Sequence, residues 1–268
     1  EKITIFEYFL NKGVLTNCKD IDNNNLFNYA AKGGNIDVMK MWVNKGVSHN
    51  TINNKGENAV LFASRGMKRR TSQLEVFKYL SLELNLEVDL VSWEGKSPLH
   101  FASRRATPEL LDFFITKGVS VNQIDENGNT ALINSVSGKT DNVKKIIPHI
   151  KNINHQNKEG HSALTIAVKR RKKENFDLLI EHQADLNVQD TEGNNLLYYA
   201  FEAHTEGKEE ITDYIINKIL TANVKGTHAY INGNTLAHIA IKKQSLFLLE
   251  KAIEIGVDIN QKNDLELS

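Results

Sequence analysis

The chain has 268 residues, its 33 basic residues are balanced by 33 acidic ones, and Cys18 is its one cysteine. A neutral molecule favours no class of partner through its overall field, and one cysteine excludes a framework of disulfide bonds. No apolar run reaches the ~18 residues of a membrane-spanning helix. The sequence begins at Glu1 without a methionine or a signal peptide, so cytoplasmic, secreted and effector locations all stay open.

A turn residue recurs at a nearly constant spacing along the chain. It occupies Asn23, Gly56, Gly95, Gly128, Gly160, Gly193 and Gly233. The successive spacings are 33, 39, 33, 32, 33 and 40 residues. A period near 33 predicts an array of stacked repeats in place of one or two globular domains. The two long intervals indicate insertions, which we expect between paired helices around residues 65–73 and 201–210, and the register through 79–88 stays open by one residue.

A short apolar segment that ends on a small residue follows each turn. These segments are 26–30, 59–63, 98–102, 131–135, 163–167, 196–200 and 236–240, and all end on alanine except the one that ends on Ser135. A small side chain lets neighbouring helices approach closely. The pattern therefore predicts that each repeat begins with a helix, and that these first helices stack on one another.

Residues 95–128 are the clearest copy of the repeating unit. Ser97 and Thr107 each precede a proline, and a hydroxyl residue followed by proline is typical of a helix start. Gly118 stands where the second helix must stop, because glycine takes the left-handed conformation without a Cβ clash. The unit therefore predicts two short antiparallel helices followed by a polar loop.

This unit resembles the ankyrin repeat family. Gly95-Lys-Ser-Pro-Leu-His-Phe-Ala102 is similar to the family signature Gly-x-Thr-Pro-Leu-His-x-Ala, and Gly118-Val-Ser-Val-Asn122 is similar to its Gly-Ala-Asp-Val-Asn close. The resemblance implies an all-α solenoid of paired antiparallel helices joined by β-hairpin-like loops. It also implies one concave surface formed by the hairpin tips and the first helices.

The resemblance extends over the whole chain as about eight units in a single array. We expect a partial unit at 1–19, then units at 20–52, 53–91, 92–124, 125–156, 157–189, 190–229 and 230–262, and the start of a further unit at 263–268. Neither end reads as a polar capping repeat, so we expect a window of a longer chain.

The residues at the ends of the second helices vary more than the turn residues. In chain order they are Gly13, Gly46, Asn85, Gly118, Ile150, Gln183, Asn223 and Gly256. Asparagine tolerates the left-handed conformation, whereas Gln183 would carry a strain of about 1 kcal/mol there. At Ile150 we expect the preceding Pro148 to end the helix.

Under the family's geometry, a stripe of basic residues follows the outward face of the first helices. We identify Arg65, Arg104, Arg105, Lys169, Arg170, Lys242 and Lys243 as candidate partner-binding residues, against one acid at these positions, Glu202. Such a stripe could hold an acidic or extended segment of another protein. The alternative is a solvated helix face, since lysine and arginine are good helix formers.

The two tryptophans have different predicted roles. Trp93 falls at a hairpin tip, where exposed tryptophan is typical of a binding hot spot. The alternative is packing against the neighbouring tip or against Tyr79. Trp42 falls on an apolar helix stripe with Met39, which predicts a core residue.

Signatures of other chemistry are weak, and we expect no cofactor, no metal and no small-molecule substrate. The basic clusters 68–70 and 169–173 lack interleaved aromatic residues, so we expect solvated turns and no nucleic acid. Residues 137–140 end like a phosphate-binding loop, but Ile133 stands where such a loop requires glycine.

The histidines divide into two groups. His100 and His238 occupy the structural histidine position of the repeat, whereas His149, His155 and His161 lack a metal-ligand spacing. The asparagines that recur at the hairpin close are expected to tie the turns: Asn17, Asn50, Asn122, Asn154, Asn187 and Asn260.

The sequence therefore predicts a non-catalytic module that recognises another protein. Two alternatives stay open. The array could be the targeting or scaffolding arm of a larger enzyme or secreted effector, or it could be a structural array without a dedicated ligand.

Overall fold

The computed structural model describes residues 12–13, 16–66, 73–205, 207–222, 230 and 233–264. They fall into two compact units, the N-terminal unit within 1–126 and 130–150 and the C-terminal unit within 127–129 and 151–268. The N-terminal unit contains α2 (Leu26–Gly33), α3 (Ile36–Asn44), α4 (Ala59–Arg65), α5 (Gln73–Lys78), α6 (Pro98–Ala102), α7 (Pro108–Thr116), α8 (Ala131–Ser135) and α9 (Thr140–Ile146). The C-terminal unit contains α10 (Ala163–Lys169), α11 (Lys173–Glu181), α12 (Leu196–Ala203), α13 (Glu209–Thr221), α14 (Leu236–Lys242) and α15 (Leu246–Glu254). The predicted all-α class is confirmed.

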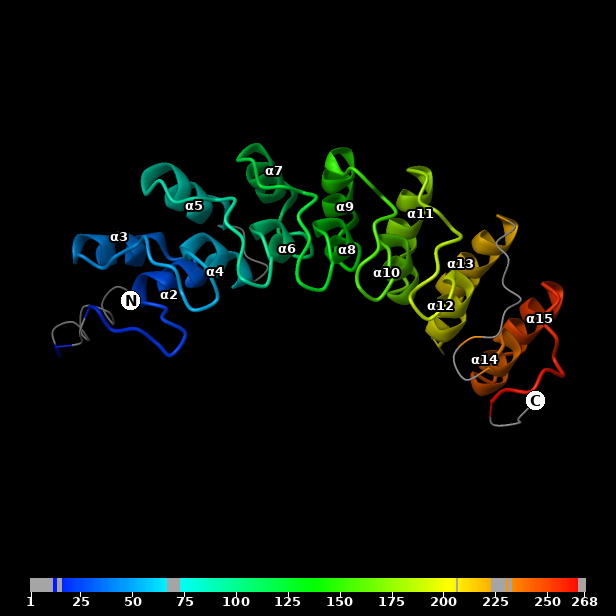
Figure 1. The fold of residues 1–268 in the computed structure, drawn as a ribbon. Coiled ribbons are helices and arrows are strands. Elements are labelled where there is room, and N and C mark those ends of the chain that lie inside the picture. Colours follow the sequence, from blue (N-terminus) through cyan, green and yellow to red (C-terminus); the bar gives the residue numbers. More distant parts are fainter. Residues whose placement is uncertain are drawn as a thin grey trace. The chain divides into compact units, whose positions relative to one another are not determined.

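Helices pair within each repeat, and the pairs stack into two layers inside each unit (Figure 1). In the N-terminal unit α2, α4, α6 and α8 contact one another in sequence, and α5, α7 and α9 form the second layer. In the C-terminal unit α10, α12 and α14 stack, and α11 packs on α13. The predicted small residues are all buried in these stacks: Ala30, Ala63, Ala102, Ser135, Ala167, Ala200 and Ala240. Trp42 is 2% exposed, which confirms it as a core residue.

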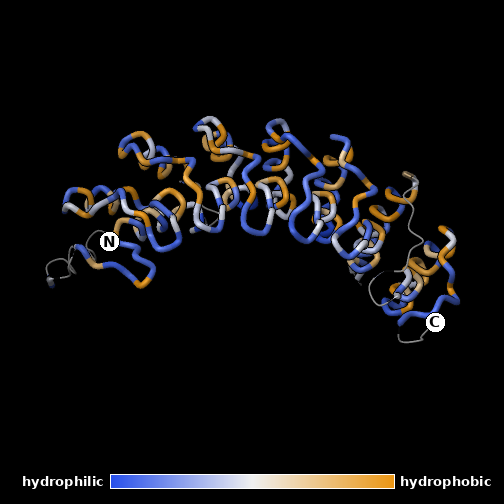
Figure 2. Tube along the Cα trace, viewed as in Figure 1, coloured by the Kyte–Doolittle hydropathy of each residue, from blue (hydrophilic) through white to orange (hydrophobic). Residues whose placement is uncertain are grey.

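Apolar residues are concentrated in the helices, while hydrophilic residues follow much of the hairpin loops (Figure 2). First helices begin after residues whose side chains accept a backbone N–H of the first turn, such as Asn25, Asn58 and Ser162. His100 and His238 contribute differently. Each Nδ1 accepts the backbone N–H of the preceding cap residue at 3.1 Å, which confirms their structural role.

Each hairpin ends in a four-residue turn that we call the tip. The tips are residues 20–23, 53–56, 92–95, 125–128, 157–160 and 190–193. All seven predicted turn residues have positive φ, between 67° and 81°. At Gly160 a Cβ would lie 2.5 Å from the backbone nitrogen of Thr191 on the next repeat, so a larger residue cannot fit there.

Neighbouring tips are joined by one repeated backbone hydrogen bond. The second residue of a tip donates its N–H to the carbonyl of the third residue of the preceding tip, as Asn54 does to Asp22 at 2.8 Å. Trp93 donates to Lys55 and Thr191 donates to Glu159 in the same way. The tips of each unit therefore keep a fixed register along the stack.

The two long intervals are accommodated partly inside helices. The helix α13 has 13 residues, whereas α3, α7, α11 and α15 have 9 each. The prediction that the second insertion lies wholly between the helices is therefore wrong. Near the first insertion, residues 67–72 lie outside the described part of the chain, and with them the cluster 68–70. Residues Tyr79–Glu83 form a π-helical turn after α5. Such a turn holds one more residue than an α-helical turn, which accounts for the one-residue uncertainty in the register through 79–88.

The ends of the second helices that the structure describes follow the predicted pattern. Gln183 has φ 62° and Asn85 has φ 52°, so both take the left-handed conformation. Ile150 is extended, and Pro148 lies in the short 3-10 turn Ile147–His149 that follows α9. Asn223 lies outside the described residues.

Candidate protein-binding surface

Arg65 ends α4, and its guanidinium is held within its own repeat. Its Nη1 lies 3.2 Å from Oε1 of Glu57, whose side chain is only 2% exposed, and the guanidinium lies 5.2 Å from the centroid of the Phe62 ring. A buried carboxylate requires a partner, so the main role of this arginine is to stabilise the fold. Its availability to another molecule is reduced.

Arg104 and Arg105 lie in the exposed turn between α6 and α7. Among the described residues, neither guanidinium makes a hydrogen bond or ion pair. The turn itself is packed against the next repeat, because a Cβ on Gly138 would lie 2.3 Å from the carbonyl oxygen of Arg104. Two unengaged guanidinium groups therefore project from a fixed backbone.

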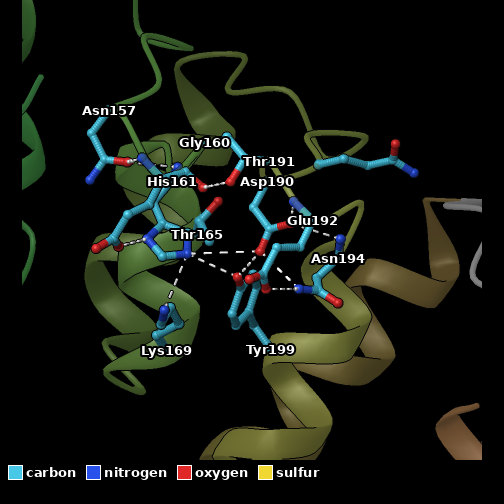
Figure 3. A network of polar contacts seen from close by, with 12 residues as sticks. Asn157, Gly160, His161, Thr165, Lys169, Asp190, Thr191, Glu192, Asn194 and Tyr199 are labelled. Atoms are coloured by element: carbon cyan, nitrogen blue, oxygen red, sulfur yellow. Dashed lines mark hydrogen bonds and ion pairs between the residues drawn. The ribbon is translucent and has the colours of Figure 1, made fainter. Parts of the chain in front are cut away.

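Lys169 is placed differently from the prediction of a groove residue open to solvent. Its Nζ lies 3.2 Å from Nε2 of His161 and 4.5 Å from the centroid of the Tyr199 ring (Figure 3). Burial lowers the pKa of the Lys169 ammonium. The side chain is thus part of a polar network between two repeats of the C-terminal unit.

His161 is the centre of this network and was not predicted as a functional residue. Its Nδ1 lies 2.8 Å from Oε2 of Glu159, and its Nε2 lies 2.9 Å from the hydroxyl oxygen of Tyr199. Burial lowers the pKa of His161, and the nearby Lys169 lowers it further. Burial and the nearby ammonium therefore favour the neutral ring, whose Nδ1 faces Glu159 and whose Nε2 faces both Lys169 and Tyr199.

Tyr199 and Asp190 form the other half of the network. The Tyr199 hydroxyl donates to the Asp190 carboxylate, which also accepts the side-chain N–H of Asn194 at 3.0 Å. Burial, with this hydrogen bond, raises the pKa of Tyr199. Burial alone would raise the pKa of Asp190, but the hydrogen bonds from Tyr199 and Asn194 outweigh it and lower that pKa.

The same pattern of aspartate, asparagine and tyrosine occurs at the first tip. Tyr29 donates to Asp20 at 2.6 Å, and Asn24 donates to the same carboxylate at 2.9 Å. Tyr29 follows Asp20 at the spacing at which Tyr199 follows Asp190, and this repeated spacing was the signal in the sequence.

The network around His161 and Asp190 therefore fastens a tip to the following helix, and the Lys169 ammonium within it opposes the binding of a cation. Among the described residues no group of histidine, cysteine, aspartate and glutamate is arranged to hold a metal ion.

Lys242 and Lys243, at the end of α14, share one partner. Their Nζ atoms lie 3.7 and 3.4 Å from the two carboxylate oxygens of Glu202, and Lys243 also donates to the Glu202 carbonyl at 2.7 Å. By contrast, the exposed Arg170 side chain has no hydrogen bond or ion pair within the described residues. Arg170 is thus the unengaged member of the basic stripe in the C-terminal unit.

Trp93 is both exposed and fixed in position. Its side chain is 75% exposed, yet a Cβ on Gly56 would lie 2.5 Å from its Cδ1 atom. Its backbone N–H donates to the carbonyl of Lys55 at 2.9 Å. One edge of the indole therefore rests on the preceding tip, as one of the two interpretations expected, and the remainder faces solvent.

A serine, a histidine and an aspartate lie in line in the C-terminal unit, but their contacts are structural. Ser245 Oγ lies 3.2 Å from His204 Nε2, and it also accepts the N–H of Leu248 as the cap of α15. His204 Nδ1 lies 3.0 Å from Thr212 Oγ1. The same His204 nitrogen lies 3.3 Å from Asp213 Oδ1. Within the described chain, that oxygen accepts no hydrogen bond of good geometry. The Ser245 hydroxyl already serves as the cap of α15, so we assign no nucleophile here.

Two of the asparagines at the hairpin close join neighbouring repeats. Asn122 donates its side-chain N–H to the carbonyl of His149 at 3.1 Å, and Asn154 Oδ1 accepts the N–H of Asp185 at 2.8 Å. The exposed Cys18 has no interaction that suggests a role. No helix in the described part of the chain is long and apolar enough to cross a membrane.

A family model and a known protein both match the chain. A family model described as ankyrin repeats (three copies) matches residues 69–154 and 135–226, which together exceed half of the chain. The mouse protein "Ankyrin repeat domain-containing protein 53" is 30% identical over 108 residues. These residues are 39% of this chain and 21% of the mouse protein, so the chain matches only about a fifth of that relative's length.

Proposed function

Because the chain belongs to the ankyrin repeat family, we propose that it binds another protein without catalysing a reaction, through the ends of its first helices. Ankyrin repeats are in general modules of protein–protein interaction and are typically non-catalytic. Rigid stacked repeats lose little conformational entropy on binding, which suits a surface made of many moderate contacts. The proposed ligand is an acidic segment of the partner.

The observation that carries this proposal is the unengaged pair Arg104 and Arg105. A guanidinium group offers a planar fork that matches a carboxylate, and both forks are exposed with no internal partner among the described residues. Arg170 has the same property in the C-terminal unit. The predicted residues Arg65, Lys169, Lys242 and Lys243 have internal partners, so we assign them mainly to the fold.

The test compares an acidic probe with two variants of the full chain. A fluorescent peptide of repeated Glu-Gly-Ser triplets is titrated against the wild type, Arg104→Gln/Arg105→Gln, and the control Lys242→Gln/Lys243→Gln. We expect the arginine variant to bind about tenfold more weakly, a loss of about 1.4 kcal/mol, and with a smaller salt dependence. The lysine variant should change the affinity less than twofold. Equal binding by all three proteins contradicts the proposal.

A second role is compatible with the first. The matched region is 21% of the mouse relative, so in that protein the repeats belong to a longer chain. The array could in the same way target or scaffold a larger enzyme or secreted effector. The full reading frame of the gene tests this role, and a reading frame that encodes only ankyrin repeats would exclude it.

A further inference from the structure

Apolar side chains are exposed within, or directly before, consecutive tips of the N-terminal unit. The exposed fractions are 95% for Ile21, 52% for Ile52, 38% for Val91, 75% for Trp93 and 48% for Ile124. In three of these tips they flank a buried polar residue, as Ile52 flanks Asn53 and Val91 flanks Ser92. The alternation of exposed and buried residues directs the apolar side chains away from the helices.

At two tips of the C-terminal unit, 157–160 and 190–193, the matching positions are polar, so the apolar row is not a general property of the repeat. Gln156 and Lys158 flank the start of one tip, and Gln189 and Thr191 flank the start of the next. All four side chains are exposed. The chain therefore provides its own comparison between an apolar and a polar row on the same backbone.

The spacing of the apolar row is set by the stack. Each tip is joined to the preceding one by a backbone hydrogen bond of 2.8–2.9 Å, from Asn54 to Asp22, from Trp93 to Lys55 and from Glu126 to Glu94. Packed helices lie about 8–10 Å apart. A segment in the extended polyproline II conformation advances about 3.1 Å per residue with three residues per turn, so every third side chain lies on one face and would meet a new tip.

Charge at these tips is predominantly acidic. Residues 19–24, 52–57, 91–96 and 124–126 contain six carboxylates and three lysines. Lys55 is paired with Asp22 at 2.8 Å, Lys96 with Glu94 at 2.6 Å and Arg65 with the buried Glu57 at 3.2 Å, so these three pairs cancel. The other three carboxylates and one lysine leave an acidic excess of two charges. This acidic surface is complementary to a basic ligand and repels the acidic segment proposed for the arginines.

We propose that the tip row of the N-terminal unit binds an extended, basic segment of a partner protein that carries an apolar residue at every third position. The proposal rests on the function proposed above and names a second, chemically opposite segment of the partner. Trp93 is the central anchor, because its ring is already fixed over Gly56 and loses little freedom on binding. An amphipathic helix needs an apolar groove, and the tips present separate projecting side chains.

The probe for this proposal is a synthetic peptide of four Leu-Lys-Ser triplets added to the full chain. Trp42 is buried and Trp93 is exposed, so a blue shift of tryptophan emission reports on Trp93. We expect binding with a blue shift, about tenfold weaker binding in Trp93→Ala and in Ile21→Ser/Ile52→Ser, and less than a twofold change in Thr191→Ala. Replacing leucine by serine or lysine by glutamate in the peptide should abolish binding.

Gly56→Ala provides a second test that leaves all the apolar residues in place. The added methyl group collides with the indole of Trp93, whereas Gly193 also has a positive φ but nothing within 4 Å of the new Cβ. We expect Gly56→Ala to weaken the leucine peptide several-fold and Gly193→Ala to leave it unchanged. Thermal melts by circular dichroism establish that each variant is folded at the assay temperature.

Three results would overturn the proposal: equal binding of the serine and leucine peptides, equal binding by Trp93→Ala and wild type, or no binding of the leucine peptide. These failures are distinct from failure of the proposed acidic site. A chain that binds the Glu-Gly-Ser probe through Arg104 and Arg105 but not the leucine peptide keeps the first proposal and loses this one.

Discussion

The Nε2 atom of His161 lies 2.9 Å from the hydroxyl oxygen of Tyr199, so one imidazole joins a tip to the first helix of the following repeat. The same nitrogen lies 3.2 Å from the ammonium of Lys169. A proton added to His161 would therefore place a second positive charge beside the lysine. Neighbouring Glu159 and Asp190 favour the added proton, but the pKa of His161 is lowered overall, first by burial and then by Lys169.

This geometry predicts that the chain loses stability in mild acid. The pKa of His161 is lower in the folded chain than the ordinary value of about 6.5, so between the two values the unfolded chain binds more protons. The contribution is complete above about pH 6.5 and is lost as the pH falls through the lowered pKa. Urea unfolding at pH 7.5 and 5.5 should show a smaller pH effect for His161→Gln than for the wild type. The exposed His182, replaced in the same way, serves as the control and should retain the full effect.

Removal of the Tyr199 hydroxyl should destabilise the C-terminal unit. Tyr199→Phe leaves the largely buried Asp190 carboxylate without its tyrosine donor, and loss of a partner to a buried polar group costs about 1–3 kcal/mol. The matched variant is Tyr29→Phe, which removes the same contact to Asp20 at a position that is 49% exposed. We expect a loss below about 1 kcal/mol there, because water can replace the donor. Equal losses in denaturant unfolding would show that burial does not decide the effect.

The two classes of arginine should differ in their effect on stability. Arg65→Met leaves the buried Glu57 carboxylate without its cation and should lower the free energy of unfolding by about 1–3 kcal/mol. Arg104→Met removes a side chain with no internal partner in the described chain and should change it by less than about 0.5 kcal/mol. Chemical denaturation of both variants measures the difference. A large loss in Arg104→Met would contradict its assignment to binding.

Gln183→Gly should stabilise the chain by about 1 kcal/mol. Gln183 has φ 62° at the end of its repeat, where an L-residue with a Cβ is strained and glycine is not. The control is Gln123→Gly, because Gln123 is not among the residues with positive φ and glycine there only adds freedom to the unfolded chain. A melting temperature that falls in Gln183→Gly would refute the strain argument.

Much of the fold could be predicted from the sequence because each repeat uses the same local chemistry. Gly95 and Gly118 mark positions where the backbone must be left-handed, and Ser97 followed by proline marks a helix start. The length of α13 could not be predicted in the same way, since an added residue in a loop and an added residue in a helix leave the same spacing between turns. The π-helical turn Tyr79–Glu83 was also hidden for this reason, and only the uncertain register pointed to it.

The candidate site was harder to predict, because exposure depends on contacts between repeats. The sequence identifies Lys169 and Arg170 as neighbours with equal charge, yet one is bound to His161 and the other is exposed. Likewise, Arg65 is held by Glu57, which lies eight positions earlier in the chain and shows no sign of burial in the sequence. The apolar residues at the tips can be read from the sequence. Their common direction can be inferred only once the polar residue next to them is known to be buried.

The bond from each tip to the preceding one has a consequence for backbone dynamics. Amides in exposed turns normally exchange with solvent deuterium quickly, since water reaches them without any opening of the structure. The amides of Asn54, Trp93 and Thr191 are already bound to a carbonyl of another repeat. Their exchange requires separation of two repeats, so these loop residues should report on the opening of the stack itself.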